Sequence, residues 1–290
     1  MSLTTAIGTA LNVTSMVSRP LAGRVAFRLF GFPSTRGVLR DGEAEIMATA
    51  RRETITVAGK TVHTYRWGDG TRPVLYVHGW RSRGSRVADH VPGLLAAGYS
   101  PITFDAPAHG ESPGRTVTIV DFADVIAALH AEHGHFEAVI AHSFGTIASL
   151  FAFRRGVTTG RLATIGGVVQ FSYLLATFGR GLRLRRTTLD ALRDRIRDWY
   201  FAGQEELWLR LDGTYRPEEL TMPILAFHDP DDTTVELAQV HRLGESYGNR
   251  ARVIITEGLG HNKIVVDPDV VAEILAFVRA GEGVRIVAGD

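Results

Sequence analysis

The sequence predicts an α/β fold in which a mostly parallel central sheet carries helices on both faces, with a small helical insertion. Three observations support this fold class. Short apolar runs such as PVLYVHGW at 73–80 are typical of strands buried on both faces. Amphipathic helical stretches separate these runs, as parallel βαβ units require. Residues 172–219 depart from the alternation, because they are helical and rich in Arg, Leu and aromatic residues.

The individual elements follow in order after the first 50 residues. TITVAG and TVHTYRWG alternate around Gly59-Lys60, which predicts a β-hairpin. After the strand in 73–80, a helical stretch passes through Val87, Val91 and Leu94. We then expect a strand in 102–110, a helix over roughly 119–133, strands at 136–141, 162–170, 223–229 and 252–258, and a last helix over 267–280.

Three parts of the chain are expected. Residues 1–50 form an N-terminal helical extension, residues 51–171 and 220–290 form the α/β domain, and residues 172–219 form a helical lid inserted into it. No repeat and no low-complexity tract is visible.

The N-terminal extension has an unusual charge pattern. Residues 1–40 contain five arginines and no acidic residue, and Leu21, Val25 and Leu29 recur at helical spacing around an arginine pair, Arg24 and Arg28. Such a basic amphipathic helix is able to contact a membrane surface or a partner. A helix that packs on the α/β domain with its arginines in water explains the pattern equally simply.

Composition excludes several classes of function. The 290 residues are 45% hydrophobic and 22% charged, as in ordinary globular proteins, and the net charge of +1 argues against a nucleic-acid partner. The absence of cysteine excludes disulfides, thiolate metal sites and a cysteine nucleophile. No apolar run is long enough to span a bilayer, and the first residues lack a basic signal region. We therefore expect a cytoplasmic protein without stable membrane insertion; its oligomeric state is not indicated.

One candidate nucleophile follows a buried strand. Ala141-His142-Ser143-Phe144-Gly145 matches the nucleophile elbow G-x-S-x-G, with Ala at the first position. In this motif a sharp strand-to-helix turn exposes the serine hydroxyl and directs the next N–H, here that of Phe144, at a developing oxyanion. The N–H of Trp80, in the loop after 73–77, is the expected second donor. We expect His142 and Tyr173 to contact the substrate.

A base and an acid follow two later strands. A serine hydroxyl needs a base to take its proton, and the base needs a carboxylate that holds its tautomer. PILAFHDPDDTTV places Asp231 and Asp232 beyond one strand, and RVIITEGLGHNK places His261 beyond the next. The order Ser, Asp, His is the order found in proteins with this elbow. The residues alone leave the two aspartates as alternatives.

Over roughly residues 53–282 the chain resembles the α/β-hydrolase superfamily, of the serine hydrolase or esterase type. The resemblance rests on HGW at 78–80, D-x-P-x-H-G-x-S at 105–112, AHSFG, and HDPDDTTV followed by GLGH. In the superfamily pattern H-G-x-x-D-x-x-V the acid precedes Val by three residues, which selects Asp232 here. Asp231 is the alternative, because Asp229 replaces the usual Gly. We expect His78, Asp105 and His109 to shape loops.

The resemblance implies cleavage of a carboxylic ester or thioester through an acyl-enzyme, with a small-molecule ester as substrate and neither cofactor nor metal. Other reactions on the same triad (carbon–carbon bond hydrolysis, lyase chemistry, perhydrolysis) and a non-catalytic, ligand-binding role are the alternatives. The H-x-x-H-x-H run at 130–135 is expected at the wrong end of the sheet for the site. The aromatics Tyr173, Phe178, Trp199 and Tyr200 predict an apolar portion in the substrate.

Overall fold

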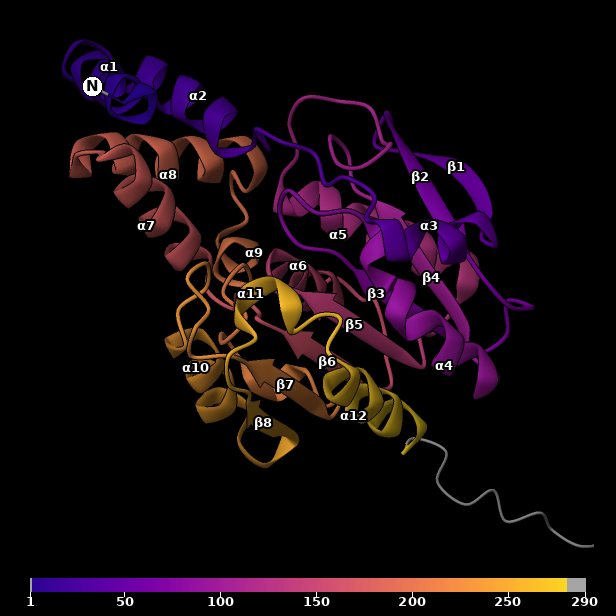
Figure 1. Cartoon of the computed structure of the whole chain (residues 1–290). Helices are drawn as coiled ribbons and strands as arrows, with labels where there is room; N and C mark the ends of the chain where they lie inside the picture. Colours follow the sequence, from indigo (N-terminus) through magenta and orange to yellow (C-terminus); the bar gives the residue numbers. More distant parts are fainter. Residues whose placement is uncertain (1, 281–290) are drawn as a thin grey trace, which may run out of the picture.

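The centre of the molecule is an eight-stranded sheet with the order β1-β2-β4-β3-β5-β6-β7-β8 (Figure 1). The computed structural model describes residues 2–280, so residues 281–290 of the predicted α/β domain lie outside the described part. The six strands β3 to β8 run parallel to one another. The β1–β2 hairpin joins β4 in antiparallel orientation. The predicted mostly parallel sheet is therefore confirmed. The strands are β1 Arg51–Val57, β2 Lys60–Arg66, β3 Pro73–Val77, β4 Ser100–Asp105, β5 Ala138–His142, β6 Leu162–Ile165, β7 Ile224–His228 and β8 Ala251–Ile255.

Helices cover both faces of this sheet, also as predicted. Successive strand residues alternate between two cores, so that Leu75 and Val139 belong to one core while Tyr76 and Ile140 belong to the other. This alternation follows from the two-residue period of a strand. Helices α5 Ile119–His133, α6 Phe144–Phe153 and α10 Ala238–Tyr247 cover the first face, and α3 Asp41–Ala48, the 3₁₀-helix η1 Gly84–His90, α4 Val91–Ala96 and α12 Pro268–Arg279 cover the second.

The strand predicted at 162–170 is longer than the observed one. The apolar run at 162–170 predicts a strand throughout, but β6 ends at Ile165. Gly166 adopts a φ of +53°, a left-handed conformation that leaves the extended strand region. The chain therefore turns away from the sheet at the same edge at which the other parallel strands end.

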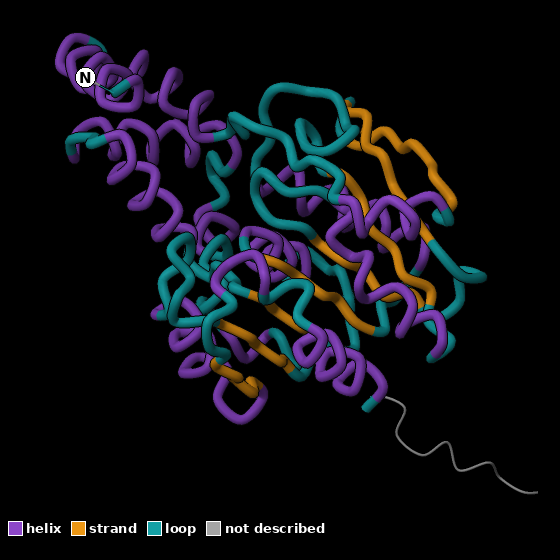
Figure 2. Tube along the Cα trace, in the orientation of Figure 1, coloured by secondary structure: helices purple, strands orange, loops and turns teal. Residues whose placement is uncertain are grey.

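Between β6 and β7 the chain forms a helical insertion, which lies beside the N-terminal helices. Figures 1 and 2 show α1, α2, α7 and α8 extending away from the sheet as one group, which we call the helical arm. Among the described residues, no helix is long and apolar enough to cross a membrane. The helices are α1 Leu3–Val17, α2 Arg19–Phe30, α7 Phe171–Leu182, α8 Arg186–Tyr200 and the short α9 Glu205–Leu209, followed by η2 Pro217–Glu219, η3 Gly248–Arg250 and α11 Gly260–Lys263 elsewhere in the chain.

Small residues join the two halves of the arm. A Cβ atom at position 8 would lie 1.7 Å from the carbonyl oxygen of Leu182, and one at position 23 would lie 2.4 Å from the carbonyl oxygen of Ala191, so both Gly8 and Gly23 allow close helix contacts. Leu21 and Val25, two of the large residues at helical spacing in α2, do not form this contact. Leu21 and Val25 are 50% and 40% exposed, because the closely packed face is made by Ala22, Gly23 and Ala26.

Candidate active site

The turn from β5 into α6 carries Ser143 in a strained conformation. Ser143 has a φ of +54° and a ψ of −121°, which is uncommon for a residue with a side chain. A side chain on Gly145 would lie 2.4 Å from the carbonyl oxygen of Val77, so glycine is required at that position. Ala141 is a strand residue of β5 that pairs with Val77, and its φ is not positive. The alanine in place of the first glycine of the motif therefore costs the turn nothing.

Three side chains from three loops form one hydrogen-bonded row at this edge of the sheet. The Nε2 atom of His261 lies 3.1 Å from the hydroxyl oxygen of Ser143, and Nδ1 lies 2.6 Å from Oδ2 of Asp232. Since a carboxylate only accepts hydrogen bonds, Nδ1 carries the proton and Nε2 offers its lone pair to the serine. The row has the connectivity of a nucleophile, a base and an orienting acid.

The backbone holds the carboxylate of Asp232 in place. Its second oxygen, Oδ1, accepts the N–H groups of Thr234 and Val235 at 2.8 and 2.9 Å. Burial opposes ionisation of this carboxyl, but the hydrogen bonds from His261 and from Val235 outweigh burial and lower the pKa of Asp232. Asp231, the alternative from sequence, makes no hydrogen bond to His261 within the described residues.

Asp229, the departure from the superfamily pattern, links the two loops that carry the acid and the histidine. Its Oδ1 accepts the N–H of Asp231 at 2.9 Å. Its Oδ2 accepts the N–H of Leu259 at 2.9 Å and the hydroxyl of Thr256 at 2.7 Å. Burial opposes its ionisation, yet the N–H of Leu259 and the Thr256 hydroxyl hold the pKa of Asp229 below its usual value. A glycine would leave these backbone groups without this acceptor.

Polar residues buried beneath the site shape the neighbouring loops. His78 donates from Nδ1 to the carbonyl of Gly79 at 2.8 Å and accepts the N–H of Ala106 at Nε2, at 3.0 Å. His109 accepts the N–H of Arg81 at 3.0 Å, and Asp105 accepts that of Gly84 at 2.7 Å. Burial lowers the pKa of His78 to about 4 and that of His109 to about 3, so both rings are neutral. These contacts agree with the loop-shaping interpretation.

His142, expected at the substrate, lies behind His261 instead. It is buried, it is absent from the residues that line the pocket described below, and its Nε2 faces the carbonyl oxygen of His261 at 3.1 Å. The two rings are in contact, with their centroids 4.7 Å apart and their planes tilted by 40°. Burial, reinforced by His261, lowers the pKa of His142 to about 3. The neutral ring thus supports the backbone and the ring of His261.

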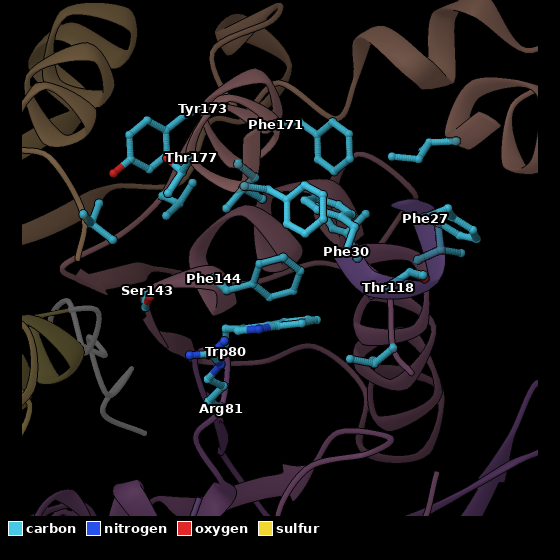
Figure 3. Close-up of a pocket in the computed structure, with 18 of the residues that line it drawn as sticks. Phe27, Phe30, Trp80, Arg81, Thr118, Ser143, Phe144, Phe171, Tyr173 and Thr177 are labelled. Carbon is cyan, nitrogen blue, oxygen red and sulfur yellow. The ribbon is translucent and has the colours of Figure 1, made fainter. Parts of the chain in front are cut away.

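An apolar cavity of about 290 Å³ begins at Ser143 and runs beneath the helical insertion. In Figure 3, Ser143 lies at one end of the cavity, Phe27 lies toward the other, and Trp80 and Phe144 form part of the wall between them. Arg81 is its only charged lining residue in the described part of the chain. The lining comprises Phe27, Phe30, Trp80, Arg81, Val117, Thr118, Ile119, Val120, Ser143, Phe144, Val168, Phe171, Tyr173, Leu174, Thr177, Phe178, Ile196, Tyr200, Phe201, Thr234 and Val235.

Phe144, Trp80 and Tyr173, all expected on the substrate side, line the cavity that begins at Ser143. Phe144 is the first residue of α6, so its N–H is among those that a helix leaves without an internal acceptor. The ring of Trp80 lies 5.3 Å from that of Phe144 between centroids. Tyr173, on α7, lines the cavity, and its hydroxyl donates to the carbonyl of Thr234 at 3.2 Å and accepts the N–H of Glu236 at 3.1 Å.

Sequence reasoning missed the contribution of the N-terminal helices to this cavity. Phe27 and Phe30, both on α2, line it, and Phe30 packs edge-on against Phe171 and Phe178. The two phenylalanines are three residues apart and lie on one side of the helix, which is the only signal the sequence offers.

The histidines at 130–135 form no metal site. His130 and His135 both contact the hydroxyl of Thr158, at 2.9 Å each. Within residues 2–280 there is no group of three or more side chains arranged to hold a metal ion.

Comparison with known proteins finds relatives of the same fold. A non-heme haloperoxidase from Rhodococcus erythropolis is 23% identical over 273 residues, covering 78% of this chain and 99% of that protein. Among solved structures, a Pyrococcus furiosus esterase superposes with a TM-score of 0.61 at 17% identity, covering 86% of this chain and 97% of that one. The thioesterase domain from the curacin biosynthetic pathway gives a TM-score of 0.57 at 14% identity, covering 79% and 99%. At such low sequence identities, the superpositions establish a shared fold and no more.

The family described as the alpha/beta hydrolase family matches residues 74–274, which is more than half of the chain and spans β3 to α12. The strained turn at Ser143 and the parallel strands β4 to β8 lie within this matched region, and the β1–β2 hairpin precedes it. The chain therefore belongs to the α/β-hydrolase family.

Proposed function

We propose that this protein is a serine hydrolase that cleaves carboxylic esters or thioesters through an acyl-enzyme. The observation that carries the proposal is the row Ser143–His261–Asp232 at the mouth of an apolar cavity, with hydrogen bonds of 3.1 and 2.6 Å. The esterase and thioesterase folds among the similar structures support the same class of reaction.

The proposed reaction proceeds in two steps. The hydroxyl of Ser143 attacks the ester carbonyl while Nε2 of His261 takes its proton, and the carboxylate of Asp232 balances the charge of the imidazolium. The N–H groups of Phe144 and Trp80 hold the negative oxygen of the tetrahedral intermediate. His261 then returns the proton to the leaving alcohol or thiol. In the second step His261 takes a proton from water, which attacks the acyl carbonyl; the bond to Ser143 then breaks, the acid leaves, and His261 returns the proton to the Ser143 oxygen.

The lining of the cavity supports an apolar substrate portion. Phenylalanines and aliphatic side chains dominate the wall beyond Ser143, and burial of an acyl chain against them contributes about 0.8 kcal/mol per methylene. We propose that α7, α8 and α9 act as a lid over this cavity, with Tyr173 at the substrate. Since Phe27 and Phe30 complete the wall, α2 takes part in substrate binding as well.

A panel of p-nitrophenyl esters of increasing chain length tests the proposal. We expect turnover to favour medium over acetyl chains, and Ser143→Ala to lower kcat by about 10⁴- to 10⁶-fold while the circular-dichroism spectrum is unchanged. Wild-type protein that binds these esters without turning them over would instead support a ligand-binding member of the fold.

A second reaction on the same triad is favoured by the haloperoxidase name of the similar protein. In perhydrolysis, hydrogen peroxide replaces water as the acceptor of the acyl group, so the same Ser143 ester yields a peracid. Peracid formation from an acyl ester and peroxide, abolished in Ser143→Ala, would establish this activity beside ester hydrolysis.

A further inference from the structure

The outward side of α1 is apolar and largely exposed; Arg185 approaches it at the sulfur of Met16, at 3.8 Å. The helix contains no charged residue, and Leu3, Val13, Met16 and Val17 are 77%, 56%, 73% and 86% exposed. Residues 13, 16 and 17 follow the spacing of a single helix face. The opposite side, with Gly8, packs against α7. Large apolar residues gathered on one exposed face mark an interaction site.

The adjoining side of α2 adds unpaired positive charge. Leu21 and Val25 are exposed, and Arg24 and Arg28 lie between and beside them along the helix, also exposed. Neither arginine forms an ion pair with a described residue. Since both helices turn their small residues toward α7 and α8, their outer sides point away from the same helix pair (Figure 1).

Charge is distributed unequally between this arm and the rest of the chain. Residues 2–30 and 171–200 contain 10 of the 32 basic residues but only three of the 31 acidic ones. The remainder of the chain is consequently net negative. This asymmetry makes the arm the part of the molecule that an anionic surface attracts, while the sheet region is repelled by it.

We propose that the outer face of α1 and α2, made by Leu3, Val13, Met16, Val17, Leu21, Arg24, Val25 and Arg28, binds the surface of an anionic lipid bilayer. An apolar helix side flanked by arginines is the pattern of a helix that lies in the plane of the interface. Each arginine near an anionic leaflet contributes favourably, and salt screens the attraction.

A second copy of the chain fits this face less well. A symmetric contact would bring Arg24 and Arg28 of one copy against the equally positive arm of the other, without acidic residues on α1 or α2 to balance them. An anionic bilayer supplies both the negative charge and the apolar layer that the face lacks.

Co-sedimentation with vesicles tests the proposal without reference to catalysis. We expect wild-type protein and Ser143→Ala to bind phosphatidylcholine vesicles that contain phosphatidylglycerol, with an affinity that falls as salt rises. The double variant Arg24→Glu/Arg28→Glu should bind at least about tenfold more weakly. Val13→Asp/Val17→Asp, which changes two exposed side chains, should lose binding as well. Because Ser143→Ala keeps the face, failure of the hydrolase assignment would leave this result unchanged.

The matched control reverses two arginines outside the arm. Arg242→Glu/Arg279→Glu changes two exposed residues on α10 and α12 and alters the net charge by the same amount. It should retain binding within about threefold. Wild-type protein that remains in the supernatant with anionic vesicles would overturn the proposal, as would an equal loss in the control. A third contradictory outcome would be a protein that binds no vesicles but forms a dimer in analytical ultracentrifugation. If Val13→Asp/Val17→Asp dissociates that dimer, the face joins two copies of the chain.

Discussion

The sheet edge and the helical arm contribute to the same cavity but are built on different principles. At the sheet edge, Ser143, Asp232 and His261 each lie just beyond a parallel strand, and such strand ends converge by topology. In the arm, α1 and α2 meet helices more than 150 residues away through Gly8 and Gly23. Local sequence therefore says much about the first region and little about the second.

The two regions differ in what restricts the choice of residue at their contact positions. The turn at Ser143 needs a small residue at 145 because the backbone of β3 passes there, and this requirement recurs wherever such an elbow forms. The close approach of α2 to α8 depends on which helix happens to cover it. The apolar spacing of Leu21 and Val25 in α2 consequently does not mark the contact, which Ala22, Gly23 and Ala26 make.

The largest expected effect separates the two adjacent aspartates at the sheet edge. Asp232→Asn should lower kcat by about 10⁴-fold, because the amide stabilises the wrong imidazole tautomer and removes the balancing charge. Asp231→Asn should cost under about tenfold, since a solvated loop carboxylate acts only through a screened charge. Measuring kcat for both on one activated ester tests the assignment. A crippled Asp231→Asn with an active Asp232→Asn would reassign the acid.

Much of the fold and of the candidate site was predictable from sequence for these reasons. Buried strands, the elbow, and the order Ser, Asp, His locate the site, and the resemblance to the superfamily pattern, through its spacing to Val235, favours Asp232 over Asp231. Three features were not predictable. Gly166 ends β6 early, Asp229 joins two loops, and Phe27 and Phe30 enter the cavity from the chain's first helices. Each depends on contacts between distant segments, which leave no local periodicity.

A smaller effect tests the packing of the arm. Gly8→Ala should destabilise the protein by about 1 to 3 kcal/mol, because the added methyl would overlap the carbonyl of Leu182. Gly181→Ala is the matched control: it lies in α7 with no atom close to the added methyl, and it should stabilise by up to about 1 kcal/mol. Urea unfolding measures both. Equal stability of the two variants would contradict the close helix contact.

The contribution of the arm to substrate binding is a still smaller effect. Phe27→Ala should lower kcat/KM for long-chain esters by about tenfold and leave acetyl esters unaffected, because only a long chain reaches the far end of the cavity. Phe32→Ala, 43% exposed and outside the cavity lining, is the control. An equal loss for both chain lengths would point to damage at the sheet edge instead.

Acid should weaken the sheet region first. Burial lowers the pKa of His90 to about 4, against about 6.5 when unfolded, so its contribution is present above about pH 6.5 and lost as pH falls toward about 4. His90→Gln should therefore reduce, by about 1 kcal/mol, the stability lost between about pH 7.5 and about pH 5.5. Urea unfolding at both pH values checks this. The arm, residues 2–30 and 171–200, contains no histidine. An unchanged pH dependence would show that His90 does not stay neutral in the fold.

Covalent labelling tests the central claim most directly. An activated serine at the end of the apolar cavity should react with a fluorophosphonate, and peptide mass spectrometry should place one adduct on Ser143. His261→Ala should abolish the labelling while Ser143 remains present, because the hydroxyl then has no base. An adduct on another residue, or labelling that persists in Ser143→Ala, would contradict the account.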